Sequence, residues 1–267
     1  MFKYILIIFY YLLFQKSLFA TEFYGKFYQG NLIIGKTLPN STVFIDRVET
    51  KVSKDGNFVF GLDKDRKNDV IIKTVNKNSS EEIIKKVYKK KYQIQKIDGL
   101  PKSQVTPPKE LYDRIKNDNK LISDARSINS DYTFFIKEFI VPIENKIITG
   151  VYGSQRILNG EPRSPHYGLD FAAEEGTPVK AMLDGEVTLA EKDLYYTGGT
   201  VIIDHGYGVS TLYMHLKDVN VSKGKIIEQG EIIGTVGKTG RSTGAHLDVR
   251  LNWFDVKLDP ASVLDLN

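Results

Sequence analysis

Residues 200–216, TVIIDHGYGVSTLYMHL, decide the fold class. Two apolar runs rich in β-branched and aromatic residues flank a turn that contains glycine, which is typical of paired strands rather than of a helix. The pattern continues on both sides, in VTLA (187–190), KIIEQGEIIGTVG (225–237) and AHLDVRLNW (245–253). Residues 134–267 are therefore predicted to form a mainly β domain built on an antiparallel sheet.

Residues 21–98 are predicted to form a separate, small β domain. The runs VFIDRV and NFVFGL lie on either side of residues 54–57, KDGN, which is a hairpin signal. Further strands are expected at 69–75 and 90–97. Because this region has no histidine and no patterned carboxylates, we expect a packing or binding module here.

Residues 99–133 are predicted to be a Pro-rich linker followed by a helix. GLPKSQVTPP (99–108) supplies the linker, and Thr106 is a candidate N-cap just before two prolines. Apolar residues near helical spacing then follow, namely Leu111, Ile115, Ile122 and Ala125.

The first twenty residues, MFKYILIIFYYLLFQKSLFA, differ from the rest of the chain. Lys3 precedes an unbroken apolar run over 4–14, and the segment ends at Ala20, so residues 1–20 are predicted to be a secretory signal peptide. The run is shorter than the roughly 20 apolar residues that span a bilayer. Leu18 makes the cleavage site imperfect, so an uncleaved anchor is the alternative, and membrane association is expected only in that case.

Composition excludes several classes of function. The chain has 267 residues, a formal net charge of +4 and no cysteine, so disulfides, cysteine zinc sites and thiol catalysis are ruled out. Export would remove Lys3 and Lys16, and the remaining charge of +2 is too weak to predict a nucleic-acid partner. The lysine-rich run 85–91 could meet an anionic surface, although a solvated strand edge protected by lysines explains it as well.

The four histidines all fall in the C-terminal β domain. The first belongs to HYGLD (166–170), which follows a turn-rich loop and leads into a strand. His166 at the end of the loop and Asp170 at the start of the strand can converge on one ion, and zinc accepts this mixture of neutral nitrogen and anionic oxygen. A structural histidine and a turn aspartate are the alternative explanation of this motif taken alone.

A second candidate is GAHLDVR (244–250). His246 and Asp248 stand two residues apart between apolar residues, so both side chains should leave the same face of a strand. A catalytic zinc site needs three protein ligands and one open position. Either residue could be the third ligand, and the other would then be available for proton transfer. Polar residues on a solvated strand are the alternative.

The remaining histidines lie in or near the stretch that decides the fold. Thr211, Tyr213 and His215 alternate in TLYMHL and are predicted to share one face of a strand. Taken alone, His215 fits a half-buried strand residue as well as a catalytic one. His205 lies at a turn and is expected to be structural.

Together these motifs resemble the lysostaphin/LytM-type zinc endopeptidases, the M23 peptidase family. The resemblance runs from FIVP (139–142) to about Pro260. It rests on the order and spacing of short motifs: GVYG (150–153), HYGLD (166–170), GTPVKA (176–181), DGEV (184–187), GTVII (199–203), TLYMHL (211–216), GEIIG (230–234) and TGRSTGAHLD (239–248). The N-terminal module, linker and helix resemble a Gram-negative envelope branch of the same family.

The resemblance implies a role for each site residue. His166 and Asp170 match the ligands of the HxxxD motif, and His215 matches the family's lone catalytic histidine. GAHLD matches the segment in which the family normally has His-x-His, the first catalytic and the second the third zinc ligand. His246 is therefore the implied catalytic histidine, and Asp248 is the implied third ligand.

Two positions depart from the family pattern. Asp248 stands in place of the ligand histidine, and Arg250 stands where an acidic residue is common. An aspartate oxygen lies two bonds beyond Cβ, as does Nδ1 of histidine, so Asp248 can reach the same point if the family's ligand histidine binds through Nδ1. Two carboxylates make Zn²⁺ a weaker Lewis acid, and its water should deprotonate less readily. An oxygen-rich site also admits Mn²⁺ more easily.

The function implied by the resemblance is a metalloendopeptidase with one Zn²⁺ per chain that hydrolyses peptide cross-links of bacterial peptidoglycan. Its partners would be the stem peptides, and its location the periplasm or cell envelope. In a Gram-negative wall the bond would join D-Ala to meso-diaminopimelate. One alternative is a catalytically degenerate relative that binds the wall or activates another cell-wall hydrolase. Another is a wall-binding module in which the N-terminal β domain is the main functional part.

Overall fold

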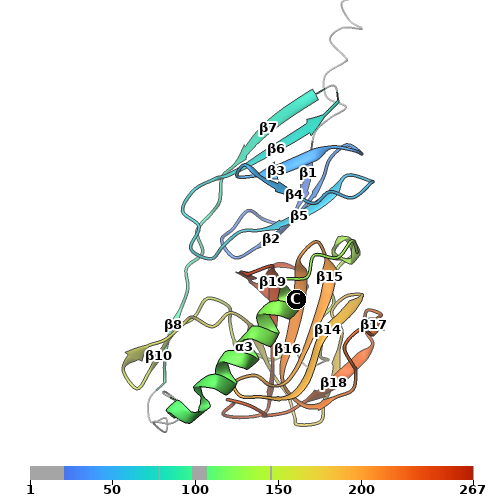
Figure 1. Cartoon of the computed structure of the whole chain (residues 1–267). Coiled ribbons are helices and arrows are strands. Elements are labelled where there is room, and N and C mark those ends of the chain that lie inside the picture. Colours follow the sequence, from blue (N-terminus) through green and yellow to red (C-terminus); the bar gives the residue numbers. More distant parts are fainter. Residues whose placement is uncertain (1–20, 78, 98–106, 145, 267) are drawn as a thin grey trace, which may run out of the picture.

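The computed structural model describes residues 21–77, 79–97, 107–144 and 146–266. The predicted signal peptide, residues 1–20, and most of the predicted linker lie outside the described residues. Figure 1 shows a small N-terminal β module next to a larger C-terminal β domain, with one long helix across the larger domain. The predicted fold class, mainly β with an antiparallel C-terminal sheet, is confirmed.

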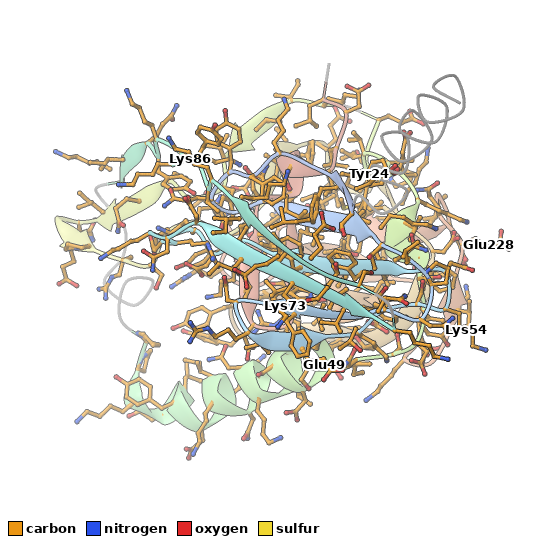
Figure 2. All side chains as sticks on the ribbon, turned by 90° about the horizontal axis from the view of Figure 1, so that it is seen from above. Tyr24, Glu49, Lys54, Lys73, Lys86 and Glu228 are labelled. Atoms are coloured by element: carbon orange, nitrogen blue, oxygen red, sulfur yellow. The ribbon has the colours of Figure 1, made fainter. Side chains whose placement is uncertain are left out.

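The N-terminal module, residues 21–88, consists of two small antiparallel sheets. One contains β1 (Glu22–Tyr24), β2 (Leu32–Lys36) and β5 (Asn57–Gly61), and the other contains β3 (Thr42–Ile45), β4 (Val48–Thr50), β6 (Val70–Asn76) and β7 (Ser79–Lys85). Both sheets contribute to a shared core that includes Ile33, Phe58, Phe60 and Ile72. Glu49 and Lys73 lie on either side of Phe44 of β3, and both side chains are exposed (Figure 2).

The predicted hairpin between VFIDRV and NFVFGL is wrong. β3 turns back onto β4 within the first run, at Asp46 and Arg47, whose φ angles are 49° and 72°. Two consecutive left-handed residues form the tight turn that matches the twist of paired strands. Residues 54–57 do turn, with Gly56 N–H donating to Ser53 O, but the following strand β5 pairs with β2 in the other sheet.

The C-terminal domain is organised around one large antiparallel sheet. Its strands lie in the order β17 (Ile226–Ile227), β14 (Gly185–Leu194), β15 (Gly198–Gly206), β16 (Val209–Val219), β19 (His246–Trp253), β12 (Leu169–Ala172) and β9 (Ile148–Gly150). β18 (Ile232–Val236) pairs with β16 and with β13 (Pro178–Lys180), and β20 (Val256–Leu258) pairs with β19. Two short 3₁₀ helices, η2 (Phe134–Ile136) and η3 (Pro260–Ser262), flank the sheet in the sequence.

The two faces of this sheet have different environments. Residues paired across neighbouring strands share a face, so Tyr213, Val249 and Leu169 line the main core on one side. On the other side, Leu212 and Ile202 pack against the helix α3 (Tyr112–Arg126). The helix begins after η1 (Lys109–Leu111), close to its expected position, and lies over β14 and β15 (Figure 1). Within the described residues, the helices are too short or too polar to cross a bilayer.

A small sheet projects beside the C-terminal domain (Figure 1). It contains β8 (Ile94–Ile97), β10 (Gln155–Leu158) and β11 (Glu161–Pro162). β8 runs parallel to β10, so the end of the segment expected to belong to the N-terminal domain pairs with a strand of the C-terminal half. Gln155 N–H also donates to Gln93 O, over 2.8 Å.

The N-terminal module is docked on the C-terminal domain through apolar contacts. Leu32 and Val59 face away from the core of their own module and are buried in the same cluster as Leu258. Asp259 reinforces the contact, because it accepts from Lys90 Nζ over 2.8 Å, and its N–H donates to Gly30 O over 2.7 Å. The N-terminal module therefore contributes two buried residues to the main apolar core of the C-terminal domain, in addition to having a core of its own.

Candidate metal centre

Three potential ligands converge on the helix-bearing face of the large sheet. Asp170 on β12 stands directly opposite Asp248 on β19, and His166 lies in the loop that precedes β12. His166 Nε2 is 3.0 Å from Asp170 Oδ1 and 3.4 Å from Asp248 Oδ2. All three side chains are buried, and their ligand atoms lie within 4.8 Å of one another. Like charges in directly opposed strand positions repel, so a cation at this place would stabilise the pair of carboxylates.

Two glycines make room for the carboxylates. A Cβ atom at Gly150 would lie 2.1 Å from Asp170 Oδ2, and a Cβ at Gly168 would lie 2.0 Å from Asp248 Oδ1. Any side chain at either position would therefore displace an acidic group of the cluster. This explains why glycine stands in the GVYG and HYGLD motifs, and a set of one imidazole and two carboxylates fits zinc.

Main-chain contacts orient His166. Its own N–H donates to Ser154 O over 2.9 Å, and Nδ1 lies 3.3 Å from Val151 O. Because a carbonyl only accepts, Nδ1 carries the proton and Nε2 turns toward the carboxylates. Burial lowers the pKa of His166, but its hydrogen bonds to Asp170 and Asp248 outweigh burial and raise the pKa to about 9.

The two predicted catalytic histidines lie side by side next to this cluster. The ring centroids of His215 and His246 are 4.8 Å apart. His215 Nδ1 is 2.9 Å from Thr239 O, and His246 Nδ1 is 2.9 Å from Gly244 O. Both rings therefore donate from Nδ1 and leave Nε2 as the reactive nitrogen. Burial lowers the pKa of His215, so its imidazole is neutral near neutral pH.

The prediction that Thr211, Tyr213 and His215 share a face is wrong. Tyr213 pairs with Val249 on the core side, where its hydroxyl accepts from Met182 N–H over 2.7 Å. His215 has a φ of 62° and sits where the register between β15 and β16 shifts. This bulge turns its side chain to the opposite face, beside His246.

His205 lies in the core. It is fully buried, with Nδ1 2.6 Å from Asp184 O and Nε2 2.8 Å from Thr211 Oγ1. Burial lowers the pKa of His205 to about 4, which keeps the imidazole neutral as a packing residue. These contacts are those of a structural histidine.

Arg250 makes a contact that the sequence did not predict. Its Nη2 is 3.0 Å from Asp248 Oδ2, and its Nε is 3.4 Å from Asp248 Oδ1. Burial alone would raise the pKa of Asp248, but the Arg250 guanidinium and the hydrogen bond to His166 outweigh it and hold that pKa well below its usual range. The only hint in the sequence is that position 250 has an arginine where the M23 pattern commonly has an acidic residue.

Comparisons with known proteins show similarity to peptidases. Residues 164–260 match the family model described as Peptidase family M23. The chain is 44% identical over 98 residues to the DD-carboxypeptidase/endopeptidase Mpg of Neisseria meningitidis serogroup B, covering 37% of this chain and 22% of that protein. It is 43% identical over 88 residues to the peptidoglycan DD-endopeptidase ShyA of Vibrio cholerae, covering 33% of this chain and 20% of that protein. The chain thus spans about a fifth of the length of these curated relatives.

A solved structure resembles nearly the whole chain. It is that of a putative peptidase M23 from Pseudomonas aeruginosa, with a TM-score of 0.68 and 25% sequence identity. The match covers 89% of this chain and 95% of that one, so it includes the N-terminal module as well as the large sheet.

Proposed function

Because the chain carries a peptidase family M23 domain over residues 164–260, we propose that it is a zinc-dependent endopeptidase that hydrolyses the peptide cross-links of bacterial peptidoglycan. The observation that carries this proposal is the convergence of His166, Asp170 and Asp248 beside two neighbouring histidines. Such a group joins three metal ligands to two proton carriers on one face of a sheet.

His166 Nε2, Asp170 Oδ1 and Asp248 Oδ2 would hold one zinc ion per chain. When bound, zinc would polarise the scissile carbonyl and lower the pKa of water, so that a nucleophile for the carbonyl carbon is available at neutral pH. The buried surroundings of the three ligands strengthen electrostatic interactions at the site. His166 is pre-oriented for this role by Val151 O.

His215 and His246 would move protons at their Nε2 atoms. His215 is neutral near neutral pH, so its Nε2 can accept a proton from the attacking water. His246 lies close enough to assist the leaving amine or to stabilise the developing oxyanion once its Nε2 is protonated. The carbonyls of Thr239 and Gly244 hold both rings in the orientation that exposes Nε2.

The proposed substrates are the cross-linked stem peptides, and the proposed bond is D-Ala to meso-diaminopimelate. The similarity to a DD-carboxypeptidase/endopeptidase and to a peptidoglycan DD-endopeptidase supports this substrate class. An exported protein in the periplasm or cell envelope fits such a substrate and fits the signal sequence predicted for residues 1–20.

A degenerate relative that binds the wall or activates another hydrolase is the second candidate. The observation in its favour is the Arg250 contact, which places a cation on the third ligand. Against it stand the other four predicted site residues, which lie together at the same place.

The test measures metal content and cleavage together. The mature wild-type chain should contain one zinc ion and release new amines from cross-linked muropeptides, whereas His166→Ala and Asp248→Ala should lose both. Asp218→Ala is the matched control, because Asp218 lies on β16 and bonds to Thr235, away from the cluster. A wild-type protein without metal that releases no amines would overturn the proposal, and an unaffected Asp248→Ala would remove Asp248 from the ligand set.

A further inference from the structure

We infer that Arg250 is the positioning residue that compensates for an aspartate in the ligand set, because it fixes the rotation of the Asp248 carboxylate and cancels one of the two negative charges that would weaken the metal as a Lewis acid. This inference rests on the proposed function, since it assumes that His166, Asp170 and Asp248 bind a divalent cation. In this inference Arg250 neither binds the metal nor transfers a proton in the reaction.

The backbone places Arg250 next to Asp248. The two residues are two positions apart on β19, so their side chains leave the same face of the strand. The long stem of Arg250 lies opposite Leu212 of β16, and its head turns back to meet both carboxylate oxygens, at 3.0 Å and 3.4 Å. A fork of two N–H groups on one carboxylate fixes its rotation as well as its charge.

The charge of the site explains why an arginine is needed. Asp170 and Asp248 are paired across neighbouring strands, and Asp248 is only 3% exposed. With histidine at position 248, as the M23 pattern has it, the three ligands would carry one negative charge. With aspartate they carry two, and the guanidinium of Arg250 returns the total to one. The two departures from the family pattern therefore compensate each other.

Arg250 and a metal ion can use the same carboxylate at once. An ionised carboxylate has about four lone-pair positions. In this structure Asp248 Oδ2 contacts Arg250 Nη2 at 3.0 Å and His166 Nε2 at 3.4 Å, so one oxygen already serves two partners. A cation bound by His166 Nε2 would approach Oδ2 from the side on which the imidazole now lies.

Neighbouring cations have contacts of their own. Arg126, at the end of α3, is 3.6 Å from Asp255, and Lys257 Nζ lies 4.1 Å from the centre of the Tyr167 ring. Lys257 pairs with Asn252, the next residue after Arg250 on this face of β19. Arg250 is the cation placed on Asp248, which makes it the residue to test.

The experiment is a double-mutant cycle on the mature full-length chain, with wild type, Arg250→Gln, Asp248→His and Asp248→His/Arg250→Gln. The summed charge of the three ligands and residue 250 is minus one in wild type, minus two in Arg250→Gln and zero in Asp248→His. In the double variant it is again minus one. Zinc affinity is measured by competition with a chromophoric chelator, and the pH profile of kcat/KM is measured on cross-linked muropeptides.

The two single variants should change zinc affinity in opposite directions, and the double variant should restore the wild-type affinity. Arg250→Gln should bind zinc at least about tenfold more tightly, and the acidic limb of its pH profile should shift upward by about one unit, because a more negative site makes the ion a weaker Lewis acid. Asp248→His should bind zinc at least about tenfold more weakly. The double variant should lie within about threefold of wild type, because the two changes of charge cancel.

Arg250→Lys keeps the positive charge but loses the pair of N–H contacts with the Asp248 carboxylate. This variant tests whether misfolding explains the effects of Arg250→Gln. It should keep the wild-type pH profile, because the positive charge is retained, but should bind zinc about threefold more weakly, because a lysine does not fix the rotation of the carboxylate. If both singles shift zinc affinity in the same direction, or if the zinc affinity of the double variant departs from wild type by more than about threefold, Arg250 has no compensating role although the enzyme stands. A wild type that takes up no zinc, while Arg250→Gln does, would show that Arg250 blocks the site, and a wild type without zinc or cleavage overturns the proposed function itself.

Discussion

At the scale of single residues, the four histidines separate into two groups by their contacts. His166, His215 and His246 each place Nδ1 against a main-chain carbonyl and direct Nε2 toward one small region of the sheet. His205 uses both of its nitrogens within the core. A histidine whose two nitrogens are both hydrogen-bonded inside the core stabilises the fold. The stability of the protein should therefore depend on the protonation of His205.

Stability at acid pH should depend on His205. Its pKa is lowered to about 4 in the folded protein, so the unfolded chain, with a pKa near 6.5, binds the proton first as the pH falls. The contribution of His205 is complete above about pH 6.5 and is lost toward pH 4, at up to about 1.4 kcal/mol per pH unit. Urea unfolding between pH 7 and pH 4.5 with a chelator present would measure the loss.

The control is His205→Asn, which can still donate to Asp184 O but cannot take up a proton. Its free energy of unfolding should be lower at pH 7, since the contact with Thr211 is lost, but should fall less steeply with acid. Equal slopes in the two proteins would mean that His205 does not titrate in this range.

At the scale of elements, α3 stabilises the sheet by covering its face over β14, β15 and β16. Ala125 is the buried residue of the helix and packs with Leu189, Ile202 and Leu212. Ala125→Asp should lower the free energy of unfolding by about 3 kcal/mol or more, because it places an unpaired charge against apolar side chains. Chemical denaturation followed by circular dichroism measures the change.

Leu121→Asp provides the matched control on the same helix. Leu121 is 43% exposed, so the same added charge remains in water and should cost less than about 1 kcal/mol. If the two variants were destabilised equally, α3 would not be anchored through Ala125.

The pattern of apolar residues was sufficient to predict strands, the antiparallel sheet and the helix after the linker, because alternation and turn glycines are local properties of the sequence. It also brought His246 and Asp248 to one face. It failed at His215, since a bulge reverses alternation without a signal at the residue itself. It also failed at the Asp46–Arg47 turn, where two residues other than glycine adopt positive φ. Which carbonyl meets which imidazole depends on loops far apart in the sequence, and periodicity carries no information about that.

At the scale of the whole molecule, the N-terminal module and the C-terminal domain share buried apolar surface, so they should unfold together. Calorimetry of the mature chain should show a single transition. Leu32→Ala, at the shared core, should lower the stability of the entire protein by about 2–5 kcal/mol without splitting that transition.

Tyr24→Ala is the corresponding control in the same module. Its side chain is 58% exposed and lies on the outside in the view of Figure 2, so its removal should change the midpoint little. Two separated transitions in the wild type would contradict a common core and would leave the module as an independent unit.

Main-chain carbonyls orient the three site histidines, so the site should tolerate substitutions in the segments that supply these carbonyls better than insertions or deletions there. A carbonyl is present whatever residue supplies it, so Val151 and Gly244 could change identity while the proton on each ring stays in place. Thr239 also holds its own segment, because its Oγ1 accepts from Gly199 N–H and donates to Leu216 O. A single inserted or deleted residue in the same segments would shift every carbonyl by one position. The positions of those protons therefore depend on the lengths of these two segments. Deletion scanning would detect this dependence throughout both segments, and alanine scanning would detect it at Thr239.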